Sequence, residues 1–357
     1  MKITEGKVEF FAPVQKKKTK TRNVSTFYNE QMEFSRDISV AVLAIFLEQQ
    51  KLKDGCDCLA ASGIRGLRYA KECGLPMTLN DLNPTAVRSI KKNIKHNNLG
   101  KKCTVTKSDA SLLMRENIFG FIDIDPFGSP VTFLDSAARS VYHRGLLAVT
   151  ATDTAPLSGT FPLTCLKKYG VKSIKTPFYS ELGLRILITN IILSCARYDK
   201  AFVPILSHAT SHYFRTFGKI EHLGKIAPLL KQFGYVYYCS CGRHYCGELV
   251  TKCKCKRKPE VCGPIYLGPI QDKSFATKVK KYIAKKKFPL WESEMKLLKS
   301  LESELDLPFY YDLHILAKKK LIRLDKTDKI IARLKKKKFK VSRTHFCQTG
   351  LKTDWKV

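Results

Sequence analysis

Short apolar runs alternate with amphipathic, helix-like segments through the first half of the chain. The runs have the length of buried strands and end in turn-forming or acidic residues. Between two of them, residues 84–97 (PTAVRSIKKNIKHN) have helical spacing and open with Pro84 at a first-turn position. Strands separated by helices predict a parallel sheet with right-handed crossovers. The expected strands are residues 56–61, 77–82, 103–107, 119–125 and 145–151.

The flanking segments follow other patterns. About the first 24 residues are polar and basic, and we expect them to become ordered only on a partner, before a helix from about Ser35 to Gln50. Residues 201–207 and 235–239 look like two late strands that pair antiparallel at the sheet edge. The last third is mainly helical by its pattern. The expected elements there are helices at 274–287, 293–305, 312–320 and 325–337 and a terminal strand near 339–346.

These elements predict an α/β fold with two domains, because 357 residues can bury two cores. Residues 1–268 are expected to form a Rossmann-like sheet domain with a cysteine-rich insertion at 239–262. Residues 269–357 are expected to form a smaller, basic and mainly helical C-terminal domain.

The chain carries 64 Lys and Arg against 31 Asp and Glu, a net charge of +33. Such a charge attracts polyanions and points to nucleic acid or an anionic membrane. A general lysine bias of the source would be the plainer explanation, with the basic runs as solvated helix faces. Few acids interleave with these runs, which favours phosphate contacts. The runs are 252–258, 278–287, 317–323 and 335–340.

The membrane alternative has little support. The N-terminus (MKITEGKVEF) lacks the apolar segment of a signal peptide. The most apolar helix, residues 183–196, looks too short to span a bilayer and contains Arg185 and Asn190. The odd number of cysteines, 13, is typical of a reducing compartment, so we expect a cytoplasmic protein. No protein partner is implied.

Acidic residues close successive predicted strands. The first strand runs into a glycine-containing turn (Ala60 to Gly66), where a nucleotide can approach the backbone. Asp81 ends the second strand, 18 residues after Gly63, the place for an acid that binds a ribose diol. Asp109 ends the third strand and is placed to accept a hydrogen bond from an adenine amino group. For each Asp the alternative role is a helix N-cap. With few phosphate contacts, the rim fits a sulfonium nucleoside better than a dinucleotide.

The fourth strand ends in Asp125-Pro126-Phe127-Gly128-Ser129, which suits chemistry on a flat amine. A carboxylate hydrogen-bonded to an aromatic amine takes its proton as a methyl group arrives. The carbonyl of Pro126 offers a second acceptor, and the ring of Phe127 offers a face on which a base stacks. The alternatives are an ordinary Asp-Pro turn and a core position for Phe127.

Six cysteines crowd one short segment, a density typical of a structural zinc site. They form two CxC pairs and two single residues rather than CxxC knuckles, so spacing does not decide which four bind metal. His244 is a further candidate ligand, and a redox role is less favoured without CxxC. The expected ligands come from Cys239, Cys241, Cys246, Cys253 and Cys255, with Cys262 as the sixth cysteine.

Several longer strings closely resemble the tRNA guanine-N2 dimethyltransferase family, which modifies the guanosine at tRNA position 26. The resemblance spans nearly the whole chain. The strings include FYNEQMEFSRDIS (27–39), ASGIRGLRYA (61–70), LNDLNP (79–84), DIDPFGSP (123–130), TATDTAPLSGTFP (150–162), ELGLRILI (181–188), HYFRTFGKIE (212–221), GPIYLG (263–268), YYDLHILAKK (310–319) and SRTHFCQTGLKTD (342–354).

The resemblance implies a class I methyltransferase that uses S-adenosylmethionine, with a C-terminal domain for tRNA. One or two methyl groups would be placed on the exocyclic N2 of guanosine 26. Asp125, with Pro126, takes the place of the catalytic acid, and Phe27 and Phe127 look like the two aromatics that sandwich the guanine. The implied cofactor contacts are Arg36, Ser62, Gly63, Arg65, Asp81, Asp109, Ala110 and Asp125.

The chain departs from the family pattern at three positions: Glu30 stands where Pro is common, Ser35 where Asn is common, and Ser158 where Cys is frequent. Ser35 puts in doubt whatever the Asn amide bonds near the cofactor. Two other functions stay open at this point. One is an RNA methyltransferase acting on another exocyclic amine, and the other is a non-catalytic, zinc-containing RNA-binding protein.

Overall fold

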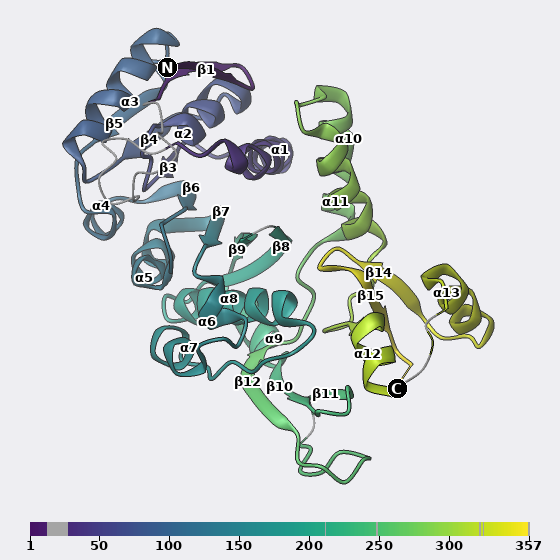
Figure 1. The fold of residues 1–357 in the computed structure, drawn as a ribbon. Coiled ribbons are helices and arrows are strands. Elements are labelled where there is room, and N and C mark those ends of the chain that lie inside the picture. The colour runs from purple at the N-terminus through teal and green to yellow at the C-terminus, as the bar shows by residue number, and fades with distance from the viewer. Residues whose placement is uncertain (13–27, 211, 248, 321–322, 324, 356–357) are drawn as a thin grey trace.

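A computed structural model describes the chain except residues 13–27, 211, 248, 321–322, 324 and 356–357 (Figure 1). Its centre is a seven-stranded sheet in the order β5-β4-β3-β6-β7-β9-β8. The first five strands of this order are parallel, and β9 runs antiparallel to both of its neighbours. The strands are β3 (Gly55–Asp57), β4 (Met77–Asn80), β5 (Cys103–Thr106), β6 (Phe119–Ile124), β7 (Val141–Ala151), β8 (Ala201–Thr210) and β9 (Tyr213–Glu221).

Helices cover both faces of this sheet, and the alternation of side chains along each strand divides the core in two. On β6, Phe121 packs into one cluster while Ile122 and Ile124 pack into the other. One cluster joins α1 (Glu33–Gln49), α2 (Ile64–Arg68) and α3 (Pro84–His96). The other joins α4 (Ala110–Glu116), α5 (Val131–Ser140), α7 (Pro162–Tyr169) and α8 (Tyr179–Ala196). The predicted α/β sheet with helical crossovers is therefore confirmed.

The N-terminus differs from the prediction. Residues 1–12 form a hairpin of β1 (Lys2–Glu5) and β2 (Val8–Phe11) that packs on the core without a partner. Val8 and Phe10 are fully buried, and this burial of apolar surface holds the hairpin on the core. The basic composition of the segment gave no indication of this packing. Glu5 is also buried and pairs with two arginines. The basic residues 16–22 lie outside the described part of the chain.

The predicted pairing of the late strands was wrong. The partner of β8 is β9, which begins just after a short turn, and not the segment at 235–239. That segment is β10 (Phe233–Tyr238), the centre of a second, three-stranded sheet with β11 (His244–Gly247) and β12 (Glu260–Tyr266). Polar residues such as Arg215 and Lys219 hid the strand character of β9. Arg215 is buried there because an ion pair satisfies its charge.

The most apolar helix is longer than expected. Helix α8 has 18 residues, so length and composition alone would let it cross a membrane. However, 72% of it is buried inside the structure, against the central sheet and β12. The charge of Arg185 is satisfied by Glu181 and by the backbone carbonyls of Tyr266 and Gly268. We conclude that α8 is a core helix of the folded chain.

The C-terminal third contains the four predicted helices and more strand than expected. The helices are α10 (Lys273–Lys286), α11 (Trp291–Ser303), α12 (Leu313–Lys320) and α13 (Thr327–Lys336). Three strands form a sheet of their own: β13 (Tyr311–Asp312), β14 (Val341–Thr344) and β15 (Cys347–Thr353). The description as mainly helical is therefore corrected to a mixed α and β region.

Helices α10 and α11 lie beside α1 (Figure 1) and share its hydrophobic core. Phe275 and Val279 of α10 and Leu298 of α11 belong to that cluster. The domain boundary between residues 268 and 269 stays a prediction, and apolar packing crosses it.

Candidate active site and metal centre

The turns that follow β3 and β4 meet at the carboxyl edge of the sheet. Asp81 accepts hydrogen bonds from the backbone N–H of Ala61, at 2.9 Å, and of Asn83, at 2.8 Å. It thereby ties the first turn to the second. Gly63 begins α2 with φ +81°, and an added Cβ would lie 3.2 Å from Ile90, so glycine suits this close turn. Ser62, next to it, is buried.

Asp109 stands at the adjacent position on the same edge and caps α4. Its Oδ1 accepts hydrogen bonds from the backbone N–H groups of Ser111 and Leu112 at 2.8 and 3.0 Å. The N-cap role proposed as the alternative for this residue is thus confirmed. Each carboxylate oxygen has two lone pairs, so capping leaves Asp109 further acceptor capacity. Ala110 follows as the buried first residue of the helix.

Asp125 is held by an arginine from the first turn. Arg65 Nη2 lies 2.5 Å from Asp125 Oδ2, and Arg65 Nη1 donates to Ser39 Oγ at 3.0 Å. Burial would lower the pKa of Arg65, but the charges of Asp125 and Asp123 outweigh it and raise that pKa well above its usual value. The structure therefore brings together Asp125 and Arg65, both predicted as site residues.

A further set of buried charged residues contacts this pair through Ser39 and Asp123. Arg215 binds both oxygens of Asp123 at 2.7 Å, and the Tyr69 hydroxyl donates to Asp123 at 2.5 Å. Arg215 also donates to Ser39 Oγ at 3.1 Å, so one hydroxyl touches both arginines. Burial raises the pKa of Asp123, but Arg215 and Arg65 outweigh it, so the net shift is downward. We call Asp123, Asp125, Arg65, Arg215, Ser39 and Tyr69 the site network.

Asp57, at the end of β3, lies close to this network. Its Oδ2 accepts a hydrogen bond from the backbone N–H of Gly66 at 2.9 Å. Burial and the neighbouring charge of Asp123 raise the pKa of Asp57 to about 7. Sequence reasoning did not single out Asp57, Tyr69 or Arg215. Asp123, two residues before Asp125, was the local signal for a second acidic residue in the network.

The turn after Asp125 is fixed from outside the strand. Gly128 has φ +93°, and its N–H donates to Thr152 Oγ1 at 2.6 Å. The Ser129 hydroxyl donates to the Tyr169 hydroxyl, which donates in turn to Asp153 at 2.6 Å. Phe127 is 71% exposed, so the core alternative for its ring is wrong. Pro126 links this ring to Asp125.

Two other predicted residues behave differently. Arg36 is directed to Glu5, with both contacts at 2.6 Å, and also donates to the carbonyl of Asn29. These partners belong to the N-terminal hairpin and its neighbourhood rather than to the rim. Phe27, the second predicted stacking ring, lies outside the described residues.

Four cysteines gather at the tip of the small sheet. The sulfurs of Cys239, Cys241, Cys253 and Cys255 all lie within 4.8 Å of one another. A tetrahedral zinc ion with Zn–S bonds of about 2.3 Å would place its sulfurs nearly 4 Å apart, so the cluster fits that ion. Burial raises the pKa of Cys253, but hydrogen bonds from the Cys255 backbone and other neighbours lower it to about 6, which favours the thiolate.

The remaining metal candidates lie elsewhere. Cys246 sits on β11 opposite Val236, outside the cluster, so its inclusion among the ligands is corrected. His244, on the same strand, packs against Phe178 and Tyr311. Cys262 is buried on β12. Spacing left the choice of four ligands open, and the fold narrows it because Cys246 lies within a paired strand, whereas the two CxC pairs form the cluster.

The comparisons with known proteins decide the family. Residues 6–357 match the family described as N2,N2-dimethylguanosine tRNA methyltransferase. The tRNA (guanine(26)-N(2))-dimethyltransferase of Archaeoglobus fulgidus is 39% identical over 349 residues, covering 96% of this chain and 95% of the relative. That of Methanosarcina acetivorans is 37% identical over 344 residues, covering 92% and 88%. The chain belongs to this family.

A solved structure of the dimethyltransferase family has the same fold. Trm1 from Pyrococcus horikoshii, in complex with S-adenosyl-L-methionine, superimposes with a TM-score of 0.89 at 34% identity. The match covers 99% of this chain and 97% of that one. The seven-stranded sheet and the regions after it are therefore shared along nearly the whole length, including the C-terminal strands.

The surface of this dimethyltransferase chain is strongly cationic in the last third. Helix α10 exposes lysines along one side, and α13 ends in a run of four more. Their positive charge is placed on solvent-facing sides of the helices, as phosphate contacts require. These lysines are Lys278, Lys281, Lys285 and Lys286 on α10 and Lys335 to Lys338 at the end of α13.

Proposed function

We propose that this chain transfers two methyl groups, one after the other, from S-adenosylmethionine to the exocyclic N2 of guanosine 26 in tRNA. Family membership over nearly the whole chain supports the reaction and the substrate. The observation that carries the residue assignment is the contact of Asp125 with Arg65, which fixes a carboxylate at the end of β6 beside an exposed aromatic ring.

Asp125 is the group that receives the proton. The lone pair of a guanine amino group is delocalised into the ring, so the nitrogen is a poor nucleophile until a carboxylate accepts its N–H. Arg65 holds the carboxylate by one oxygen, Oδ2, and leaves Oδ1 for the amine. Phe127 stacks on the guanine and keeps the nitrogen in line for attack.

The rim residues fit an adenosine. Asp81 accepts backbone hydrogen bonds with both oxygens, and their remaining lone pairs suit a ribose diol. Asp109 and Ala110 suit the adenine, while Ser62 and Gly63 let the backbone approach the nucleoside. When bound, S-adenosylmethionine supplies an electrophilic methyl group on a sulfonium. Arg36 completes the proposed set through its position on α1, although Glu5 occupies its guanidinium.

The four-cysteine cluster is proposed to hold one structural zinc ion that closes the tip of the small sheet. Metal analysis of the purified chain should find about one zinc per molecule. Cys253→Ser should lose it, whereas Cys246→Ser, a matched change outside the cluster, should keep it. Zinc bound equally by both variants would contradict this ligand set.

The function itself is tested by incubating the chain with labelled S-adenosylmethionine and unmodified tRNA and then mapping the label. We expect N2,N2-dimethylguanosine at position 26, and a transcript with adenosine in place of that guanosine should accept no label. Label elsewhere, or on an adenine, would contradict the proposal. The odd number of cysteines, 13, is typical of a reducing compartment, and we propose the cytoplasm.

A further inference from the structure

A cleft of about 420 Å³ opens between the sheet domain and the C-terminal strands, apart from the residues assigned above. One wall is the segment 175–179, which leads into α8. The other walls come from β10, α12 and the turn between β14 and β15. The volume is in the range of ligand-binding clefts. The residues that matter are Lys175, Thr176, Tyr179, Tyr238, Lys319 and Phe346.

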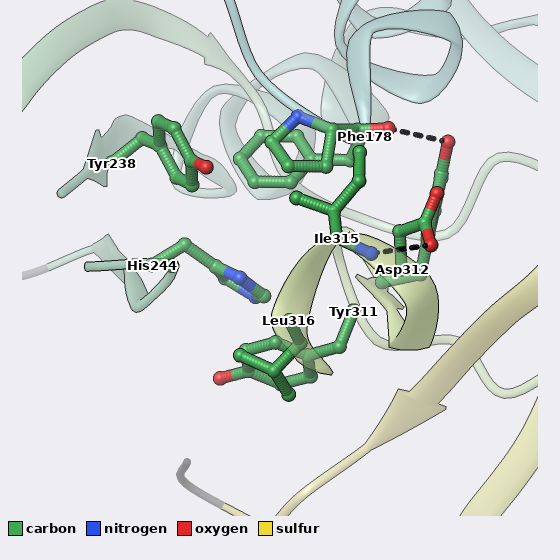
Figure 2. A pocket seen from close by; sticks show the side chains of 10 residues that line it. Phe178, Tyr238, His244, Tyr311, Asp312, Ile315 and Leu316 are labelled. Atoms are coloured by element: carbon green, nitrogen blue, oxygen red, sulfur yellow. Dashed lines mark hydrogen bonds between the residues drawn. The ribbon is translucent and has the colours of Figure 1, made fainter. Parts of the chain in front are cut away.

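The inner end of this cleft is lined largely by aromatic rings. Figure 2 shows Tyr238 and His244 on one side, facing Tyr311, Ile315 and Leu316 on the other. The rings of His244 and Tyr311 lie 4.3 Å apart between centroids. Because burial lowers the pKa of His244 to about 4, this imidazole is neutral at physiological pH. The inner wall is therefore mostly aromatic and aliphatic, with Asp312 as its carboxylate.

The single carboxylate in the lining is already satisfied. Asp312 Oδ1 accepts hydrogen bonds from the N–H groups of His314 and Ile315 and from the Thr349 hydroxyl. A second contact, from the Tyr310 hydroxyl to the carbonyl of Pro177 at 3.1 Å, joins the two walls. With its carboxylate engaged in these bonds, Asp312 opposes an anionic ligand less than a bare carboxylate would.

The mouth of the cleft has the chemistry of a nucleotide site. Tyr179 is 50% exposed, and Phe346 lies in the β14–β15 turn with its ring stacked at 10° on Tyr310. Lys319 donates to the Tyr238 hydroxyl and to the carbonyl of Ser240, which leaves the third donor of its ammonium for a phosphate. Lys175 is exposed at the opposite wall.

Thr176 lines the cleft without offering its hydroxyl to a ligand. The residue is 9% exposed, and its Oγ1, which is shielded from solvent, has no hydrogen-bond partner among the described residues. A buried hydroxyl without a partner is unfavourable by itself. A base or ribose in the open cleft reaches this atom only if the wall shifts.

We propose that this cleft binds an unstacked nucleotide of the tRNA, distinct from the guanosine that is methylated. The inference rests on the proposed function, because it assigns a second contact to the same RNA. The base stacks on the exposed ring of Tyr179, and the adjoining phosphates lie against Lys175 and Lys319. Stacking on aromatic rings accepts any base, so this contact anchors the RNA without reading its sequence.

The cleft is joined to the candidate active site through the β14–β15 turn. His345, next to Phe346, bonds Glu304 through its Nδ1 at 2.6 Å, and burial lowers the pKa of His208 to about 3. His208 packs edge-on against Phe34 of α1 and against Tyr213. An RNA strand held in the cleft would thus be anchored beside the elements that form the site network.

Tyr179→Ala tests the proposal, with Tyr179→Phe as the variant that keeps the ring. Tyr198→Ala is the matched control, because Tyr198 is also exposed, at 37%, and lies about 28 Å away along α8. Affinity is measured for an unmodified tRNA transcript and for a blunt RNA duplex without unstacked bases. Tyr179→Ala should weaken tRNA binding by roughly 5- to 100-fold and leave duplex binding unchanged. Tyr179→Phe and Tyr198→Ala should bind both RNAs as the unchanged chain does.

Wild-type tRNA affinity of Tyr179→Ala would overturn the proposal, as would an equal loss for tRNA and duplex. Displacement of tRNA by free guanosine monophosphate, relieved by Tyr179→Ala, would assign the cleft to a free nucleotide and also overturn it. Lys175→Ala and Lys319→Ala should each lower the salt dependence of tRNA binding by about one unit of slope.

The outcome is separable from the proposed function. Binding of S-adenosylmethionine by Tyr179→Ala should equal that of the unchanged chain, which shows that the variant is folded. Methyl transfer by the unchanged chain tests the function, whereas the ratio of tRNA to duplex affinity tests the cleft. At saturating tRNA, kcat of Tyr179→Ala should lie within about twofold of the unchanged value, with the effect confined to KM.

Discussion

Two buried clusters of arginines and carboxylates both include residues of α1, and they are built from the same groups. The site network joins Arg65 and Arg215 to Asp123 and Asp125. The second cluster joins Arg36 and Arg68 to carboxylates of the N-terminal hairpin, α1 and the π-helical turn η3 (Tyr69–Cys73), and Glu294 of α11 lies against it. We call this second set the interdomain network; its carboxylates are Glu5, Asp37, Glu72 and Glu294.

The two clusters differ in the solvent exposure of their carboxylates. The site network reaches the surface at Asp125, whose side chain is 21% exposed beside the ring of Phe127. In the interdomain network every carboxylate is buried, and the excess of acids is relieved by protonation. Burial and the charge of Asp37 raise the pKa of Glu294 to about 9. A buried ionic cluster thus indicates a reaction site only where one charged group faces a space that a substrate can enter.

The substitution with the largest expected effect removes the exposed carboxylate of the site network. Asp125→Asn keeps the shape of the side chain but removes the proton acceptor, so kcat should fall by about 10²- to 10⁴-fold. Affinity for S-adenosylmethionine, measured by calorimetry, should stay within about twofold, since the rim keeps Asp81 and Asp109. The control is Asp135→Asn, an exposed acid on α5, which should retain full activity. Near-normal turnover by Asp125→Asn would remove its assigned role.

The second substitution tests the buried part of the same network. Arg215→Leu leaves Asp123 charged and buried without its bidentate partner, which should lower the free energy of unfolding by about 3–5 kcal/mol in urea denaturation. Arg197→Leu, which breaks an exposed pair with Asp135, should change it by no more than about 0.5 kcal/mol.

Arg215→Lys separates stability from positioning. It keeps the charge but loses the bidentate geometry, so stability should recover in part. The residual misplacement of Arg65 should still lower kcat more than it raises the KM for tRNA. Full recovery of both quantities would show that only the charge of Arg215 matters.

The interdomain network predicts a pH dependence opposite in sign to that of Asp123 in the site network, whose lowered pKa makes its contribution fall as pH falls. Glu294 holds a proton in the folded chain up to a pKa of about 9, whereas its ordinary pKa is 4.5. The contribution of this group to stability is therefore fully present below pH 4.5 and falls as pH rises toward 9, by about 1.4 kcal/mol per pH unit. Glu294→Gln removes the titrating group and should remove its part of the slope, leaving below pH 7 the part that comes from Asp57.

Urea denaturation at pH 6, 7.5 and 9 measures this slope. Glu292→Gln, an exposed acid on the same helix, should leave the slope of the unchanged chain. If Glu294→Gln instead destabilises the chain at all three values, the carboxyl of Glu294 is ionised and acts as an ordinary partner of Arg68. Methyl transfer at pH 7.5 should be unaffected by either change.

The contrast between the clusters also shows what sequence can predict. Asp81, Asp109 and Asp125 were identified because each closes a strand, and local pattern carries that information. Arg215 and Glu5 were not, because their partners Asp123 and Arg68 lie 92 and 63 residues away along the chain. Arg215 also interrupts the apolar pattern of β9, so the sequence did not predict this strand. Its burial depends on the ion pair with Asp123, which forms only in the folded chain.

The smallest effect concerns the turn that carries Asp125 and Phe127. Tyr169→Phe removes the hydroxyl that accepts from Ser129 and donates to Asp153, which should lower stability by about 1 kcal/mol. Tyr198→Phe, at the far end of α8, is the control and should change nothing. If the turn is held mainly by Arg65 and by the contact of Gly128 with Thr152, kcat of Tyr169→Phe should fall less than about tenfold. A loss as large as that of Asp125→Asn would mean that positioning of the turn, rather than the carboxylate itself, limits the reaction.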